Sequence, residues 1–167
     1  RFTGIDVSTW QGWINWSAVA QNNHFAIIRA GYGNGGVDDY FETNYQNAKA
    51  AGVKVGAYWY SYATSASDAV NEANSIMSVL AGKQFEWPIY YDIEEQSIFS
   101  AGIQNEIAKA FCRTLEANKY FCGIYSSASA LNSYFDDEVK TLFSIWVAHW
   151  DTDVPAYYGD YGVWQYK

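Results

Sequence analysis

The feature that most constrains the fold is an alternation of short apolar segments with longer segments of helical periodicity. Expected strands, rich in β-branched and aromatic residues, lie at 4–7, 25–30, 53–62, 88–93, 121–125, 144–150 and 161–166. Expected helices lie between the early strands, at 39–51, 67–80 and 104–119. Ser67 is placed as an N-cap, and Gly52 and Gly82 follow two of the helix ends. This order is typical of βαβ units and a parallel sheet.

Helical segments become scarce after Tyr125. One short helix is expected at 127–134, and no full crossover helix fits between Trp150 and Tyr161. The 167 residues suffice for one hydrophobic core, and no linker or repeat divides them. We therefore predict an α/β fold with a single domain over residues 1–167. Its form is a modified, flattened β/α barrel, TIM-like, whose last strands lack helices.

The composition argues against several classes of partner. The formal net charge is −8, whereas nucleic acids and anionic membranes bind positive surfaces. No apolar run reaches the length of about 18 residues that a membrane span requires. The two histidines, His24 and His149, are far apart in the chain. Neither a metal site nor a cofactor is expected.

Aromatic residues are unusually abundant, at 19% of the sequence, with eight Trp and fifteen Tyr. Two interpretations remain open at this point. The rings can belong to a Tyr-rich fold that carries them at its rims, or they can line a groove whose flat, amphipathic walls bind sugars.

The two cysteines favour buried thiols over a disulfide. Cys112 falls within an expected helix, and Cys122 falls in the strand that follows it. Packed layers of secondary structure lie roughly 10 Å apart, whereas the Cα atoms of bridged cysteines lie about 4.4–6.8 Å apart. We therefore expect two unbridged thiols.

The segment WPIYYDIEEQ carries the strongest chemical signal. Side chains alternate faces along a strand, so Asp92 and Glu94 share one face, with Tyr90, while Glu95 faces away. Barrel enzymes keep their active sites at the carboxyl ends of strands. Two adjacent carboxyls also push one pKa upward, which gives the acid and the anion that glycosidic cleavage needs. The alternative is that Asp92 opens a solvated loop.

Other expected strands end in residues that can join this pair. Asp6 ends the first strand and is either a site acid or a loop or capping residue. Arg29 lies inside the second strand and either neutralises an acid or extends its charge out of the barrel bottom. The expected substrate-binding residues, all near strand ends, are Tyr32, Tyr60, Tyr62, Tyr125, Trp150 and Gln165.

Seven strings resemble, in order, those of family 25 of the glycoside hydrolases. They are GIDVSTWQG, AIIRAGYG, GAYWYSY, YYDIE, GIYSS, IWVAHW and GVWQY, and they run from Gly4 to Tyr166. The resemblance implies a muramidase that cleaves the β-1,4 bond between N-acetylmuramic acid and N-acetylglucosamine in peptidoglycan. It implies Glu94 as general acid, Asp92 as the anion that supports the substrate's own 2-acetamido group as nucleophile, and Asp6 as an assisting acid.

The resemblance also implies a secreted, monomeric enzyme that acts on the cell wall, with the peptidoglycan glycan strand as its partner and no nucleic acid or membrane. Members of the family continue past the WQY string into a last strand with a further acid, whereas this sequence ends at Lys167. A barrel without its final strand is therefore expected. Two alternatives remain: a chitinase-like or endo-N-acetylglucosaminidase-like hydrolase, and a glycan-binding protein with impaired catalysis.

Overall fold

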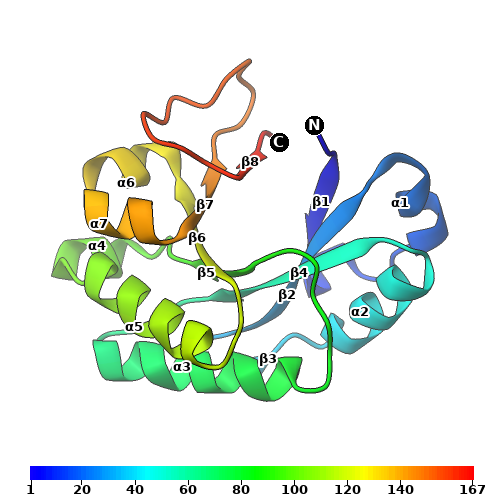
Figure 1. Ribbon diagram of the computed structural model, residues 1–167, viewed down its shortest axis with the longest axis horizontal. Coiled ribbons are helices and arrows are strands. Elements are labelled where there is room, and N and C mark those ends of the chain that lie inside the picture. Colours follow the sequence, from blue (N-terminus) through cyan, green and yellow to red (C-terminus); the bar gives the residue numbers. More distant parts are fainter.

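The computed structural model describes residues 1–167 and contains a single twisted sheet (Figure 1). The strands are β1 (Gly4–Val7), β2 (Phe25–Tyr32), β3 (Gly36–Val37), β4 (Lys54–Tyr60), β5 (Ile89–Asp92), β6 (Cys122–Ser127), β7 (Ser144–Ala148) and β8 (Val163–Gln165). Their order is β1-β2-β4-β5-β6-β7-β8, with β3 paired to β2. All neighbours are parallel except β3, which forms an antiparallel hairpin with β2. The seven expected strands are confirmed, and the short β3 was not foreseen.

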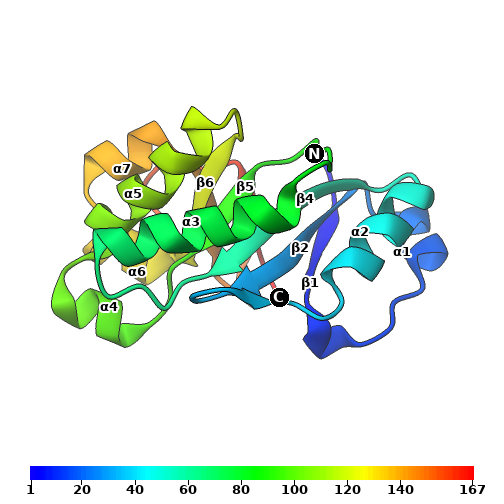
Figure 2. The same ribbon diagram turned by 90° about the horizontal axis from the view of Figure 1, so that it is seen from below.

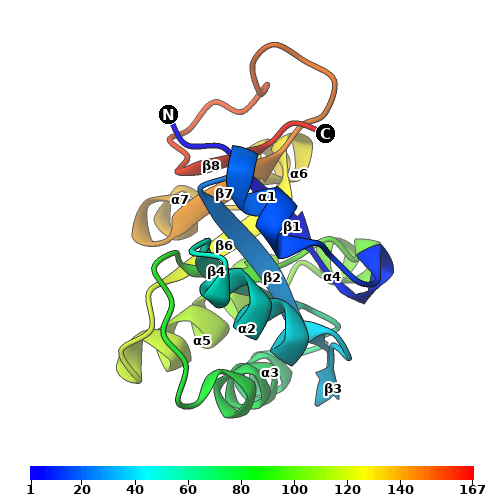
Figure 3. The same ribbon diagram turned by 90° about the vertical axis from the view of Figure 1, so that its right-hand side faces the viewer.

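The sheet curls without closing. Strand β1 pairs only with β2, and β8 pairs only with β7, so an open seam separates the two edges. Both chain termini lie beside this seam (Figure 3). The prediction of a flattened β/α barrel whose last strands lack helices is confirmed, because β7 leads to β8 through an irregular segment. No strand joins β8 to β1.

The helices cover the outer face of the sheet (Figure 2). They are η1 (Thr9–Gln11), α1 (Trp16–Asn22), α2 (Phe41–Ala50), α3 (Ala66–Leu80), α4 (Gln96–Ala101), α5 (Gln104–Ala117), α6 (Ala128–Ser133) and α7 (Asp137–Leu142). The expected helices correspond to α2, α3, α5 and α6. The elements η1, α1, α4 and α7 were missed because they span one or two turns, too short to show a helical period.

The start of α3 corrects the sequence-based expectation. The N-cap is Ser65 rather than Ser67, since the Ser65 side chain accepts a hydrogen bond from the backbone N–H of Asp68. The Asp68 carboxylate in turn accepts the backbone N–H of Thr64. Two unpaired donors at the helix start are satisfied in this way. Gly52, by contrast, follows α2 with a positive φ of 80°, as expected for a residue just past a helix end.

Two apolar clusters lie on opposite faces of the sheet. The outer cluster contains 37 buried residues and lies between the sheet and the helices. The inner cluster contains the buried residues Phe25, Ile27, Tyr90, Tyr125, Trp146 and Ala148. The expected alternation along β5 is confirmed, because Tyr90 joins the inner cluster while Ile89 and Tyr91 join the outer one.

Cys112 and Cys122 are both buried and unbridged, as expected. Their sulfur atoms nevertheless lie 2.8 Å apart, a contact that the spacing of the two backbones did not predict. Both side chains point into the same interface between α5 and the sheet, so they meet across the gap that separates the two backbones. None of the helices has the length and apolar character required to cross a membrane.

Candidate active site

The acidic pair lies at the carboxyl end of β5, in the middle of the sheet. Asp92 is the last residue of the strand and stands in register between Tyr60 of β4 and Tyr125 of β6. The Asp92 side chain is buried, and its Oδ1 atom has no hydrogen-bond partner. Glu94 follows the strand, is exposed, and lies within hydrogen-bonding distance of Asp92. The structure thus brings together the two acids that the sequence placed on one face.

The charges around Asp92 oppose its ionisation. Burial raises the pKa of Asp92 well above its ordinary value, and the hydrogen bond to Glu94, the negative charge of Glu94 and that of Asp6 raise it further. The Arg29 cation acts in the opposite direction but more weakly. In the free protein, therefore, the surroundings of Asp92 favour its neutral form.

Asp6 reaches the same region from β1 and is held by a glutamine from the far edge of the sheet. Gln165 of β8 donates from Nε2 to Asp6 Oδ2 at 2.9 Å, across the open seam. Burial raises the pKa of Asp6, the Gln165 hydrogen bond lowers it, and the charge of Glu94 raises it. Asp6 is therefore one of three acids that influence one another, which favours the site interpretation over a role in capping or in a loop.

The Gln165 amide is itself fixed in orientation. Its Oε1 accepts the hydroxyl of Tyr125 at 2.6 Å and the indole N–H of Trp150 at 2.8 Å. An amide oxygen that accepts two donors cannot exchange places with its nitrogen without losing both bonds. Three of the expected substrate-binding residues, Gln165, Tyr125 and Trp150, thus form one hydrogen-bond network with Asp6.

Glu95 contradicts the expectation that it faces away. Its Oε1 accepts the hydroxyl of Tyr60 at 2.6 Å, so it lies beside the residues of β4 at the site. The alternation rule failed because β5 ends at Asp92, and Glu95 already occupies the N-cap position of α4. Tyr60, expected to bind substrate, uses its hydroxyl to hold this second glutamate.

Arg29 does not extend out of the barrel bottom. Its Nε donates to Asp38 Oδ2 at 2.7 Å, in an ion pair whose side chains are 12% and 0% exposed. Asp38 also accepts the backbone N–H groups of Thr9 and Tyr40. Of the two interpretations left open, the structure favours a cation held near the acids, since Arg29 lowers the pKa of Asp92.

Exposed rings surround the acids. Tyr32, Tyr62 and Trp150 are 42%, 55% and 58% exposed, so their faces remain available to a ligand. The Arg29 guanidinium lies 5.2 Å from the centre of the Tyr32 ring. Trp10, 83% exposed, stands in η1, close after Asp6 in the chain, and was missed as a candidate. The sequence did point to Trp10, because this residue lies in the string GIDVSTWQG that carries part of the family resemblance.

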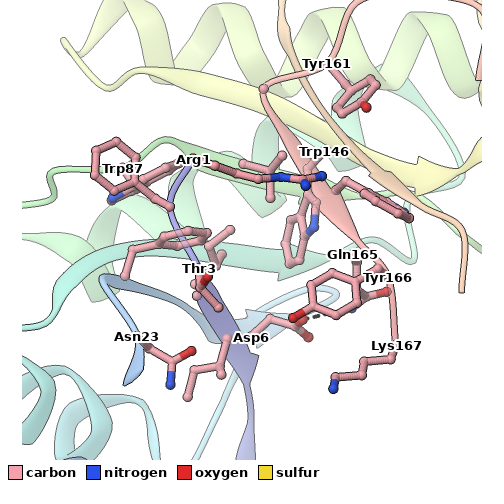
Figure 4. A pocket seen from close by; sticks show the side chains of 18 of the residues that line it. Arg1, Thr3, Asp6, Asn23, Trp87, Trp146, Tyr161, Gln165, Tyr166 and Lys167 are labelled. Atoms are coloured by element: carbon pink, nitrogen blue, oxygen red, sulfur yellow. Dashed lines mark hydrogen bonds between the residues drawn. The ribbon is translucent and has the colours of Figure 1, made fainter. Parts of the chain in front are cut away.

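A cavity of about 890 Å³ occupies the open seam (Figure 4). Trp87, Trp146 and the two chain termini contribute to its walls, and Asp6 and Gln165 lie in its lining. Asp92 and Glu94 are not part of this lining. The cavity therefore borders the acid cluster at Asp6 rather than enclosing the acidic pair. No group of three or more His, Cys, Asp or Glu side chains is placed to hold a metal ion.

An open β/α barrel that gathers acids at the carboxyl ends of its strands, beside exposed aromatic rings, has the arrangement found in barrel-type glycoside hydrolases. The sequence matches the profile of Glycosyl hydrolases family 25 over residues 5–167, and the chain belongs to this family.

Individual relatives agree with this assignment. Lysozyme M1 of Streptomyces globisporus is 33% identical over 182 residues, which cover 98% of this chain and 61% of that protein. YegX of Escherichia coli K12 is 33% identical over 161 residues, covering 88% of this chain and 56% of that protein. The crystal structure of the bacterial lysozyme from Streptomyces coelicolor superposes with a TM-score of 0.79 at 30% identity, over 98% of this chain and 82% of that one. The chain thus spans about three fifths of these curated relatives.

Proposed function

We propose that this protein is an N-acetylmuramidase, a lysozyme that hydrolyses the β-1,4 bond between N-acetylmuramic acid and N-acetylglucosamine in peptidoglycan. The observation that carries the proposal is the acidic pair at the end of β5, one member exposed and the other buried within hydrogen-bonding distance of it. Family membership and the lysozyme name of a relative support the same reaction. We further propose that it acts as a secreted, single-domain monomer on the cell wall.

The exposure of the two acids suggests how they divide the work. Glu94 is the acid that a glycosidic oxygen can reach, so it is the proposed proton donor to the leaving sugar. Asp92 is buried, and its burial and the neighbouring Glu94 raise its pKa, so the two adjacent carboxyls favour a state in which they share one proton. Once that proton has moved to the leaving group, the pair carries the negative charge that stabilises a cationic transition state.

The closeness of the two acids also bears on the route. In glycosidases that use two carboxyls directly, the groups flank the sugar and lie about 5–9.5 Å apart. Asp92 and Glu94 instead lie next to each other at the end of β5, which places them on one side of the bond. A nucleophile from the substrate, its own 2-acetamido group, fits this arrangement. Asp6, oriented by Gln165, adds a further negative charge near the site.

The aromatic residues complete the proposed substrate site. Tyr32, Tyr62 and Trp150 present exposed rings for sugar faces. Tyr60 and Tyr125 direct their hydroxyls to Glu95 and to Gln165, so they would contact the glycan through their ring edges rather than through free hydroxyls. We propose the peptidoglycan glycan strand as the ligand of this site.

Mass spectrometry of peptidoglycan digests tests the proposal. The protein is incubated with purified cell walls, and the new reducing ends are identified after borohydride reduction. The expected result is reduced N-acetylmuramic acid, absent from a digest with Glu94→Gln. Reducing ends of N-acetylglucosamine, or turnover of chitin oligomers without wall hydrolysis, would instead establish the chitinase-like or glucosaminidase alternative. Binding of wall fragments with no release above the Glu94→Gln level would indicate a glycan-binding protein.

A further inference from the structure

A buried glutamate lies directly behind the proposed site, on the helix-covered face of the sheet. Glu72 of α3 is 2% exposed and forms none of the ion pairs of the molecule. Burial raises the pKa of its carboxyl. Isolated buried carboxylates are unfavourable, and an apolar residue would be the better choice where only packing is needed. The presence of Glu72 therefore calls for a role that packing alone does not supply.

Three donors converge on the Glu72 carboxylate. Its Oε1 accepts the hydroxyls of Ser61, at 2.9 Å, and Tyr91, at 2.5 Å, and its Oε2 accepts the backbone N–H of Tyr62 at 3.0 Å. Ser61 and Tyr62 directly follow β4, and Tyr91 is the second-last residue of β5. One helix side chain thus ties together the carboxyl ends of two neighbouring strands.

The same residues hold Asp92 by its backbone. Tyr91 precedes Asp92 in the chain, and its ring stacks on Phe111 of α5 with centroids 3.8 Å apart and planes 1° from parallel. The backbone N–H of Ser61 donates to the carbonyl of Asp92 at 2.9 Å. The Asp92 carbonyl is therefore bonded to Ser61, and the side chains of Ser61 and of the preceding Tyr91 are both held by Glu72 from behind the sheet. The Asp92 carboxylate itself has an unpartnered Oδ1, so its direction depends on this backbone.

We propose that Glu72 is a positioning residue for the reaction: through Ser61 and Tyr91 it fixes the backbone that aims the Asp92 carboxylate. The inference rests on the proposed function. Productive geometry requires acids placed to within a fraction of an ångström, and small misplacements lower the rate strongly. Loss of the Glu72 hydrogen bonds is therefore expected to lower kcat with little effect on KM, since no substrate contact is removed.

The test compares three variants by kcat and KM on soluble peptidoglycan, normalised to the folded fraction, and by Tm. Glu72→Gln keeps the shape and removes the charge. Its amide nitrogen can only donate, so it cannot accept at both places where the carboxylate accepts the two hydroxyls and the Tyr62 N–H. Tyr91→Phe removes one hydroxyl and leaves the ring stack and every charge in place. Asn44→Ala is the matched control: Asn44 is also a buried, hydrogen-bonded helix residue, but it accepts from Trp16 and touches neither strand end.

We expect kcat to fall about tenfold for Glu72→Gln and about threefold for Tyr91→Phe, with KM within twofold of the wild-type value. Asn44→Ala should lower Tm while leaving kcat within twofold. If Glu72→Gln lowers Tm as the control does but keeps the wild-type kcat, Glu72 is only structural and the proposal is wrong. If Glu72→Gln does not fold, Tyr91→Phe decides in the same way.

A readout without turnover separates this proposal from the proposed function. The titration of the Asp92 carboxyl is followed by carbon NMR in the wild type and in Tyr91→Phe. A displaced midpoint supports the positioning role even if the wild type releases no muramic acid, in which case only the proposed reaction fails. An unchanged midpoint together with unchanged kcat overturns the positioning role while leaving the reaction intact.

Discussion

The outer face of the sheet buries a continuous cluster of 37 residues beneath the helices, whereas the inner face buries a cluster of six, most of them aromatic. The polar groups differ as well. On the outer face, Glu72 receives three donors. On the inner face, Asp92 keeps an unpartnered oxygen and stands close to two other acids. One face holds the fold together, and the other keeps unfavourable charges in place for chemistry.

This contrast predicts that stability and activity respond to different residues. Substitutions on the outer face should lower the free energy of unfolding and leave the turnover of the folded protein unchanged. Substitutions among the acids should lower turnover, with little loss of stability or even a gain. Glu72 and its hydrogen-bond partner Tyr91 are the exceptions, because their substitution is expected to lower turnover as well.

The largest effect is expected for Leu115→Ala in α5. Leu115 is 0% exposed within the outer cluster, so its truncation leaves a cavity. The free energy of unfolding should fall by about 2–5 kcal/mol, as measured by denaturant titration, while kcat per folded molecule stays within twofold. Leu142→Ala on α7, where the side chain is 48% exposed, is the control and should change stability by less than about 0.5 kcal/mol.

The next effect is the loss of activity in Glu94→Gln. Removal of a general acid lowers hydrolysis by at least about 10²-fold, whereas an exposed residue contributes little to stability, within about 0.5 kcal/mol. The rate of reducing-end release measures the activity, and thermal melting measures the stability. Glu116→Gln, an exposed glutamate on α5, should alter neither. A wild-type rate in Glu94→Gln would remove Glu94 from the role of acid and weaken the contrast between the faces.

The sequence predicted the parts of this molecule that follow from local periodicity. The strand rhythm placed Asp92 at the end of β5, and alternation along that strand separated Tyr90 from Tyr91 correctly. Glu95 was placed wrongly because alternation holds only within a strand, and β5 had already ended. The contact between the Cys112 and Cys122 sulfur atoms was not predicted, because the spacing of two backbones does not show where their side chains meet.

Long-range contacts were beyond local reasoning. Gln165 and Asp6 are 159 residues apart, and their hydrogen bond exists only because the sheet curls until its two edges face each other. Glu72 looks in the sequence like any polar residue of an amphipathic helix. Its burial follows from the position of α3 against the ends of β4 and β5, where Ser61, Tyr62 and Tyr91 donate to it, and this tertiary contact leaves no mark in the helix sequence itself.

A smaller effect tests whether Gln165 acts through Asp6. Gln165→Leu removes the hydrogen bond to Asp6 and should lower kcat/KM about tenfold, within the range for bonds to charged groups. In an Asp6→Ala background the same substitution should have a clearly smaller effect, because only the bonds from Tyr125 and Trp150 remain to be lost. Losses that multiply fully would show that Gln165 contacts the substrate independently of Asp6.

The smallest effect concerns the free energy of unfolding that is lost when the buried Asp92 carboxyl ionises. Since burial and Glu94 raise the pKa of Asp92 in the folded protein, the folded state binds that proton more tightly than the unfolded chain does. Its contribution to stability is complete below about pH 4, near the unfolded value, and is lost as the pH rises through the folded pKa. Asp92→Asn cannot ionise, so it escapes this loss.

Denaturant titration should therefore show Asp92→Asn to be more stable than the wild type at pH 7 and equal to it at pH 3. Asp6 and Glu72, whose pKa values burial also raises, are present in both proteins, so their contributions largely cancel in the comparison. A variant that is less stable than the wild type at pH 7, or a difference that does not depend on pH, would show that the Asp92 carboxylate is favourable where it stands. The acids of the inner face would then not reduce the stability of the fold, and the contrast with the outer face would fail.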